Sequence, residues 1–317
     1  MLCIYYNESK ITNTDHLENH HRINTAIRII TKNLKSDVQI YSNLQLEDYL
    51  TNLTKFKNKE SLAITFLEKV YSVDYLIDIK NMCLDLKDDE IIDGDTYFSR
   101  LTYNEIIDNA NILYNVCYQI VNKNIKYAYC IIRPPSHHSS KDNFSGFCIV
   151  NQTFLTAKTL HDIYKKRVLI LDYDLHHGDG TQKLVEYYNQ DAIYFCSMHY
   201  YAKNFFPGTG SEKENSDKIL NIPIRQKNKT DDEYLQVFNS MVKPFIEKNK
   251  VDIIIISNGF DAHKDDPMKI MNLTEKYYVE VASYLKTLDI PLIYILEGGY
   301  NPKTIGTISN DIIKILY

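Results

Sequence analysis

Three aspartates and two histidines crowd into one segment near the middle of the chain, Leu171-Asp172-Tyr173-Asp174-Leu175-His176-His177-Gly178-Asp179-Gly180. In an extended segment alternate side chains share a face, so Asp172, Asp174 and His176 are expected to point the same way. Aspartate and histidine together suit zinc, iron or cobalt. An isolated D-x-H pattern is more often a solvated polar loop, so a metal site here requires a ligand from another segment.

Asp261 is the candidate for that further ligand, because it follows a separate apolar run that ends at Ser257. A catalytic ion has few protein ligands and keeps one position open for water. The sequence therefore predicts a catalytic metal held by Asp174, His176 and Asp261.

A pair of adjacent histidines follows another apolar run, in Arg133-Pro134-Pro135-Ser136-His137-His138. On its own such a pair is more often a surface accident. Beside a metal, His137 and His138 are candidates for a general base and a general acid, because imidazole titrates near neutral pH. Asp172 and Asp179 are available to fix the tautomers of the two rings.

The segment Leu296-Glu297-Gly298-Gly299-Tyr300 ends with a possible hydrogen-bond donor. The two glycines allow the backbone to approach a neighbour closely. Tyr300 is a candidate donor to a developing oxyanion. The alternative is a plain turn in which the apolar body of the tyrosine packs, as tyrosine often does.

These polar segments follow apolar runs that read as strands buried on both faces. The strand candidates are Tyr127–Ile132, Arg167–Leu171, Ala192–Ser197, Val251–Ser257 and Pro291–Leu296. Helix candidates alternate with them at Asn151–Lys165, Asp231–Lys248 and Thr274–Leu288, and Pro244 is expected to kink or shorten the second of these helices. The first 125 residues look more helical, with candidates at His21–Leu34, Ser61–Val70 and Tyr103–Val121.

Alternation of strands and helices predicts an α/β fold with a mostly parallel central sheet flanked by helices. Ligands of such sheets bind outside the carboxyl ends of the strands, so the polar segments are expected to meet in one crevice. No stretch has the composition of a linker, which favours a single domain over residues 1–317.

The composition excludes several classes of protein. A net charge of -5 argues against direct binding of nucleic acid. The six cysteines form no C-x-x-C pair, which favours free thiols in a reducing compartment. No signal sequence or membrane-spanning run is recognised, so we expect a soluble intracellular protein, in the cytoplasm or the nucleus.

Together the motifs resemble the zinc-dependent histone deacetylase and acetylpolyamine amidohydrolase family, whose members have an arginase-like α/β fold. The resemblance covers most of the chain and is closest to the class II branch. It rests on H-L-E-N-H-H-R-I from His16, on Tyr71–Leu76 and Asp95–Ser99, on RPPSHH, Gly146-Phe147-Cys148 and DYDLHHGDGTQ, and on Phe205–Gly210, Gly259–Ala262, Asp266–Met268 and LEGGYN.

The resemblance implies a role for each of these positions. It implies one catalytic Zn²⁺ on Asp174, His176 and Asp261, with Asp172 orienting His137 and Asp179 orienting His138. Tyr300 would polarise the acyl carbonyl. It implies a narrow acyl-lysine channel lined by Gly146, Phe147, Phe206 and Met268. It also implies a structural K⁺ held by Asp172, Asp174, His176, Ser197 and Met198.

The chain departs from the family pattern at three positions. Leu17 stands where the family has proline, Ser136 where it usually has glycine, and Ser139 where it usually has alanine or glycine. Leu17 bears on the rim and on substrate specificity, and Ser136 on the geometry of the histidine loop.

Three functions fit the motifs. The first is hydrolysis of acyl-lysine in a protein or peptide. The second is deacetylation of a small acetylated amine such as an acetylpolyamine, although some polyamine-specific relatives have glutamate where this chain has Met268. The third is an inactive relative that only binds acylated partners, which we expect to lack a ligand, a histidine or the tyrosine.

Overall fold

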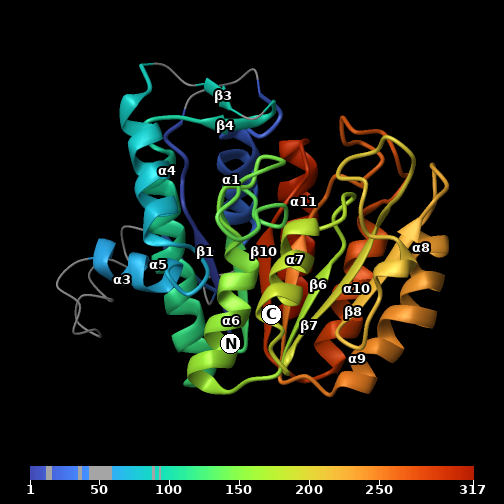
Figure 1. The fold of residues 1–317 in the computed structure, drawn as a ribbon. Helices are drawn as coiled ribbons and strands as arrows, with labels where there is room; N and C mark the ends of the chain where they lie inside the picture. Colours follow the sequence, from blue (N-terminus) through green and yellow to red (C-terminus); the bar gives the residue numbers. More distant parts are fainter. Residues whose placement is uncertain (12–15, 35–37, 43–58, 88–89, 93) are drawn as a thin grey trace.

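β-Branched and other apolar residues form a central sheet of eight strands, all of them parallel (Figure 1). The structure is a computed structural model that describes all residues except 12–15, 35–37, 43–58, 88–89 and 93. In spatial order the strands are β2 (Gln39–Ser42), β1 (Leu2–Tyr6), β5 (Tyr127–Ile131), β10 (Leu292–Leu296), β9 (Ile253–Asn258), β6 (Val168–Asp172), β7 (Ile193–Tyr200) and β8 (Ile219–Ile224).

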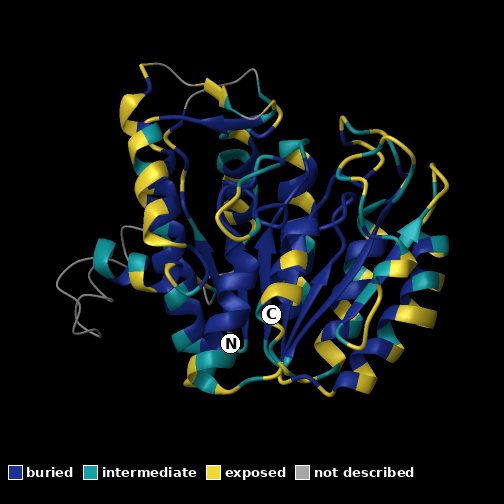
Figure 2. Cartoon of the chain, in the orientation of Figure 1, coloured by how far each residue is buried: buried dark blue, intermediate teal, exposed yellow. Residues whose placement is uncertain are grey.

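Successive side chains of each strand enter two different hydrophobic cores, one on each face of the sheet. In β9, Ile253 and Ile255 belong to one core, and Ile254 and Ile256 belong to the other. Because both faces are covered, the inner strands β5, β10, β9, β6 and β7 are buried from end to end, while the outer helices carry exposed residues (Figure 2).

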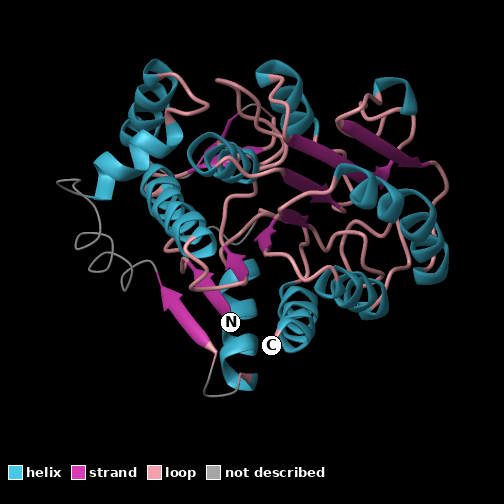
Figure 3. Cartoon of the chain, turned by 90° about the horizontal axis from the view of Figure 1, so that it is seen from below, coloured by secondary structure: helices cyan, strands magenta, loops and turns pink. Residues whose placement is uncertain are grey.

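Two layers of helices cover the sheet, as the view from below shows (Figure 3). The helices that contribute to the first core are α3 (Lys59–Leu67), α4 (Val73–Asp85), α5 (Thr102–Val121), α6 (Gln152–Tyr164) and α7 (Asp179–Tyr188). Those that contribute to the second are α1 (His21–Asn33), α8 (Asp231–Val237), the π-helix η2 (Phe238–Val242), α9 (Lys243–Asn249), α10 (Glu275–Thr287) and α11 (Pro302–Leu316).

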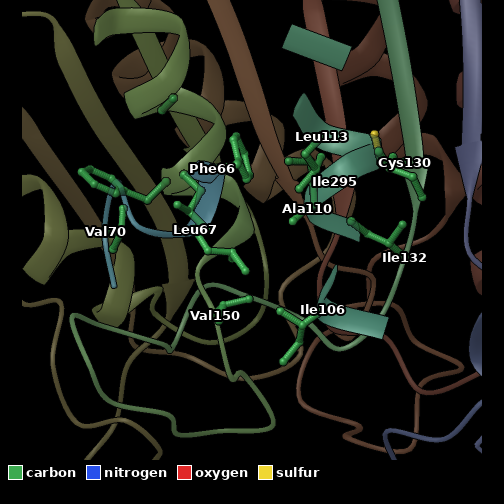
Figure 4. Close-up of a cluster of buried hydrophobic side chains, with 14 of the residues drawn as sticks. Phe66, Leu67, Val70, Ile106, Ala110, Leu113, Cys130, Ile132, Val150 and Ile295 are labelled. Atoms are coloured by element: carbon green, nitrogen blue, oxygen red, sulfur yellow. The ribbon is translucent and has the colours of Figure 1, made fainter. Parts of the chain in front are cut away.

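The first core joins the middle of the sheet to α5. Ala110 and Leu113 of this helix belong to the same cluster as Cys130 of β5 and Ile295 of β10 (Figure 4). All four side chains are at most 2% exposed. This packing fixes the ends of β5 and β10, from which two of the polar segments depart.

The α/β class, the single domain and all five predicted strands are confirmed. The mostly helical reading of the first 125 residues is incomplete, because β1 and β2 join the sheet there. These strands are short, and their partner β5 begins at Tyr127. Short apolar runs acquire their strand character from such distant pairing, which local patterns do not carry.

The predicted helix at Asp231–Lys248 is interrupted. It consists of α8, the π-helix η2 and α9, and Pro244 lies in the first turn of α9. Proline has no backbone N–H and cannot continue an α-helical ladder, which accounts for the irregular turn just before it.

The remaining described elements are a small antiparallel pair, β3 (Glu90–Ile92) with β4 (Thr96–Phe98), and the 3-10 helix η1 (Glu212–Glu214). Within the described part of the chain, no helix combines the length and the apolar character that a membrane crossing requires.

Candidate metal centre and acyl channel

Four adjacent strands deliver the predicted site residues. In the order β5, β10, β9 and β6, these strands lie side by side at the middle of the sheet. They are followed by the histidine pair, by Tyr300, by Asp261 and by Asp174 with His176, respectively. Because the strands are parallel, their carboxyl ends share one edge, and the four polar segments meet there as expected.

Asp174, His176 and Asp261 form a compact group of possible ligands whose ligating atoms all lie within 4.8 Å of one another. His176 Nδ1 lies 2.9 Å from Asp261 Oδ2 and 3.2 Å from Asp174 Oδ1. Backbone amides hold the carboxylates in place: Gly298 N donates to Asp174 Oδ2, and Leu175 N donates to Asp261 Oδ1. All three side chains are buried.

The extended geometry expected for residues 172–176 stops at Asp172. This residue ends β6, and residues 174–176 form a bend. Asp172 therefore contacts the backbone of the ligand segment, where its Oδ1 accepts from Asp174 N, and its Oδ2 lies 3.0 Å from His137 Nδ1. The bend places Asp174 and His176 together and leaves Asp172 for the histidine.

The two adjacent histidines have different carboxylate partners. His137 pairs with Asp172, and His138 Nδ1 lies 2.8 Å from Asp179 Oδ1. The two rings lie 3.9 Å apart, and His137 Nε2 lies 3.8 Å from Asp174 Oδ1. Both expected histidine–aspartate pairs are thus present in the geometry.

The surroundings move the two imidazole pKa values in opposite directions. Burial and the neighbouring charge of His137 lower the pKa of His138 to about 3. Burial also acts against protonation of His137, but the carboxylates of Asp174 and Asp172 outweigh it and raise its pKa well above the usual value. The site thus separates a neutral ring from a protonated one.

A lysine that the sequence reasoning missed touches one of the orienting carboxylates. Lys183 Nζ lies 2.6 Å from Asp179 Oδ2, one helical turn along α7. Burial opposes ionisation of Asp179, but His138 and Lys183 hold its pKa well below the ordinary range. The i, i+4 spacing within a predicted helix is the signal that points to such a pair.

A narrow channel of about 170 Å³ leads to the ligand group. Its walls include all four predicted channel residues, Gly146, Phe147, Phe206 and Met268. Of the other lining residues, His138 and His176 are buried, Tyr300 and Asp95 are half-buried, and Leu17 is exposed. Asp95 lies in a motif recognised from sequence but was not expected to line the channel.

Gly146 is required by the narrowness of this channel. Its φ is +54°, and a Cβ at this position would lie 2.6 Å from the His138 ring and 2.9 Å from the Phe206 ring. The Phe206 ring in turn lies 4.8 Å from the His138 ring. The wall and the catalytic candidates are therefore packed directly on each other.

Tyr300 lies at the channel, where its ring meets the edge of Phe147 at 5.9 Å. Its backbone N–H donates to Asp266 Oδ2, and the Arg22 guanidinium lies 5.1 Å from its ring centre. Burial and the nearby Asp261 carboxylate raise the pKa of Tyr300 well above its usual value. The hydroxyl therefore keeps its proton at physiological pH and can donate a hydrogen bond.

The residues expected around K⁺ occupy neighbouring strands. Asp172 of β6 pairs in register with Ser197 of β7, and Met198 follows in the same strand. Ser197 Oγ lies 2.9 Å from His199 Nδ1. Asp172, Ser197 and Met198 thus lie on adjacent strands, next to the segment that carries Asp174 and His176.

A second acid and histidine cluster, His137 with Cys148 and Glu297, also lies within 4.8 Å. It is a poor cation site, because the Glu297 carboxylate already accepts hydrogen bonds from Ser136, His137 and Thr153. Burial and the Glu297 charge also raise the pKa of Cys148 well above that of a free thiol. The sequence reasoning did not single out Glu297, although a glutamate directly after a buried strand is a visible signal.

Comparison with known proteins agrees with this geometry. The profile described as "Histone deacetylase domain" matches residues 16–316. The chain belongs to the histone deacetylase domain family. This confirms the resemblance that the motifs indicated.

Relatives within the histone deacetylase domain family come from distant organisms. The chain is 31% identical over 229 residues to "Histone deacetylase 15" of Arabidopsis thaliana, which covers 70% of this chain and 41% of that protein. It is 32% identical over 245 residues to a "Probable deacetylase" of Archaeoglobus fulgidus, covering 74% of this chain and 67% of the relative. The match to "Histone deacetylase 6" of Caenorhabditis elegans has 36% identity and covers 60% of this chain but 21% of the relative.

The matched regions therefore make up less than half of the plant and nematode proteins. A solved structure of the family, "Crystal Structure of HDA15 HD domain", superposes with a TM-score of 0.86 at 24% identity. It covers 99% of this chain and 89% of that structure. This superposition establishes the family fold for the chain.

Proposed function

We propose that this chain is a zinc-dependent deacylase that hydrolyses the amide of acyl-lysine in proteins or peptides. The observation that carries the proposal is the meeting of the Asp174, His176 and Asp261 group with His137, His138 and Tyr300 at one narrow channel. Residues 1–317 would form a single catalytic domain.

The chemistry of the donor set supports a bound cation. Asp174 and Asp261 are buried carboxylates, and among the described residues neither forms an ion pair with lysine or arginine. Burial and the Asp174 charge raise the pKa of Asp261, which shows that the second negative charge is unfavourable there without a cation. Two carboxylates and one imidazole match a catalytic zinc site with an open position.

A zinc ion in this position would act as a Lewis acid on the acyl carbonyl and would lower the pKa of a water at the site. His138 is neutral near pH 7 and is the proposed general base for that water. Asp179 accepts from His138 Nδ1–H, which leaves Nε2 free to take the proton.

His137 is the proposed proton donor to the leaving amine. Asp172 holds its orientation through Nδ1, and this carboxylate favours the protonated form of the ring. The Tyr300 hydroxyl would donate to the oxygen that becomes negatively charged as the carbonyl carbon turns tetrahedral. One donor of this kind contributes about 3 to 4 kcal/mol.

The channel supports an extended acyl-lysine rather than a branched or strongly cationic substrate. Phe147 and Phe206 provide apolar walls for the methylene stem of lysine. Met268 places an apolar side chain where a second cationic amine would need a carboxylate. An acetylpolyamine is the competing substrate class, and an inactive acyl-lysine-binding protein is the alternative without catalysis.

The K⁺ site, the partners and the cellular location are also proposals, drawn from the family resemblance and the composition. Asp172, Asp174, His176, Ser197 and Met198 are proposed to hold a structural K⁺. The partners are proposed to be acylated proteins or peptides, without direct binding of nucleic acid or insertion into membranes. The protein is proposed to work inside the cell.

The decisive test measures zinc binding and turnover together. Chelated protein is titrated with Zn²⁺ by calorimetry, and turnover is then measured on acetyl-lysine peptides, longer acyl-lysine peptides and acetylpolyamines. We expect one Zn²⁺ per chain and preference for the peptides. Asp261→Ala should abolish both zinc binding and hydrolysis. Asp265→Ala removes a largely exposed carboxylate from the same loop and is the matched control.

Unchanged metal content and turnover in Asp261→Ala would contradict the site. Zinc and hydroxamate binding without turnover of any substrate would favour the inactive binding protein. Faster turnover of acetylpolyamines than of peptides would favour the second substrate class.

A further inference from the structure

The Glu297 carboxylate is a buried anion that is satisfied by hydrogen-bond donors instead of a cation. Its side chain is 0% exposed. Oε2 accepts from the backbone amides of Ser136 at 2.6 Å and His137 at 3.1 Å. Oε1 accepts from the hydroxyls of Ser136 at 2.5 Å, Thr153 at 3.0 Å and Ser257 at 3.3 Å. A buried carboxylate with this many donors is firmly fixed.

The donors that matter most belong to the loop of the histidine pair. Two consecutive amides, of Ser136 and His137, point at one carboxylate oxygen. If that acceptor were lost, both amides would be buried without a partner, which is unfavourable. The orientation of the peptide before His137, and hence the position of its ring, therefore depends on Glu297.

The same residue also connects this loop to the ligand group. The next amide along the chain, Gly298 N, donates to Asp174 Oδ2 at 2.8 Å. The end of β10 thus contacts His137 through the Glu297 side chain and Asp174 through the adjacent backbone. It sets the separation between the histidine and the ligand group.

Ser136 adds a donor at the position where the family pattern usually has glycine. Its hydroxyl contacts both Glu297 and Thr153, and the side chain is 1% exposed. The departure from the pattern is therefore accommodated inside the Glu297 cluster and not in the channel.

We propose that Glu297 is a positioning residue for the catalytic histidine pair and that the Ser136 hydroxyl helps to hold it. Glu297 does not line the channel, and its side-chain hydrogen bonds reach none of the proposed ligands but do reach the loop of His137. This inference rests on the proposed function, because it assigns the histidines to proton transfer.

The effect expected on removing the carboxylate is a loss of turnover at constant binding. Glu297→Gln keeps the shape but turns an amide NH₂ group towards the donors. Misplacement of a catalytic group by about 1 Å can lower turnover by about 100-fold. We expect kcat to fall by about 10- to 100-fold, with KM, zinc stoichiometry and hydroxamate affinity within about threefold of wild type. Ser136→Ala should lower kcat by about two- to fivefold.

Ser309→Ala is the control. Ser309 lies in α11, is fully buried, and its hydroxyl accepts a hydrogen bond from Tyr129 of β5. The substitution should leave kcat unchanged. A readout independent of activity is the NMR spectrum of zinc-free protein with ¹⁵N-labelled histidine. Glu297→Gln and Ser136→Ala should shift the ring signals of His137, and Ser309→Ala should not.

Wild-type kcat and unshifted His137 signals in both cluster variants would overturn the proposal. A fall in kcat that runs in parallel with loss of zinc or of hydroxamate affinity would also overturn it, because Glu297 would then act on the metal site. If Glu297→Gln does not fold, kcat and the His137 ring signals of Ser136→Ala test the proposal. Lack of turnover in the wild type refutes the proposed function instead, while the histidine spectra still report on the Glu297 contact.

Discussion

Gly298 lies directly against the Asp174 carboxylate. A Cβ at this position would come within 2.4 Å of Asp174 Oδ2 and 2.8 Å of Asp261 Oδ2. The glycine that donates its amide to one proposed ligand is thus also the residue whose missing side chain leaves room for both.

Gly298→Ala is expected to displace the ligand carboxylates and weaken zinc binding by at least about tenfold, because a contact of this length requires a shift of buried atoms. Zinc titration of the chelated protein measures the effect. Gly94→Ala is the control: φ there is +76°, but a Cβ would meet nothing within 4 Å. This variant adds a methyl group that crowds no other atom, and it should keep wild-type zinc affinity. Equal zinc affinity in Gly298→Ala would argue against the ligand set.

Lys183→Met removes the cation that contacts the carboxylate partner of His138. The lysine side chain is 55% exposed, so the effect should be small, about two- to fivefold in turnover, as for other exposed ion pairs. The difference from wild type should shrink at high ionic strength. Lys158→Met breaks a pair of the same spacing and length with Asp162 and should not change turnover. Equal effects of the two variants would mean that Lys183 acts only on helix stability.

Arg133→Gln is expected to destabilise the fold strongly. The buried guanidinium contacts Glu18 at 2.5 Å and Glu105 at 2.9 Å, and its loss leaves Glu105 without its cation and Glu18 with Arg22 alone. Breaking a buried pair of this kind costs about 3 to 5 kcal/mol. Urea unfolding measures it. Arg225→Gln breaks the exposed pair with Glu212 and should have little effect. A similarly small effect at Arg133 would show that the buried network relaxes around the change.

The lowered pKa of Glu18 makes the stability of the fold depend on pH. Burial alone would raise its pKa, but the guanidinium groups of Arg133 and Arg22 hold it below the ordinary 4.5. Because the folded pKa is the lower one, the stabilisation is complete above about pH 4.5 and is lost as the pH falls through the folded value.

The stability difference between wild type and Glu18→Gln should therefore shrink on acidification. The slope can reach at most about 1.4 kcal/mol per pH unit for one group. Urea unfolding of chelated protein between pH 7 and pH 3 measures this difference. A difference that does not vary with pH would show that Glu18 titrates alike in the folded and unfolded chain.

The sequence by itself determined the strand candidates, most helices and the candidate site residues. Runs such as the four isoleucines of β9 indicate a buried strand from local pattern alone. The short motifs around Asp174 and His137 indicate metal and proton-transfer chemistry only in combination, because each of them alone is more often a polar loop or a surface pair.

Only the tertiary structure decided which partners meet. His176 and Asp261 are 85 positions apart, and Ser136 and Glu297 are 161 apart. Their contacts depend on the order β5, β10, β9, β6 in the sheet, which differs from the order in the chain. That order and its register result from the packing of both helix layers against the sheet, a property of the whole chain that no local segment contains.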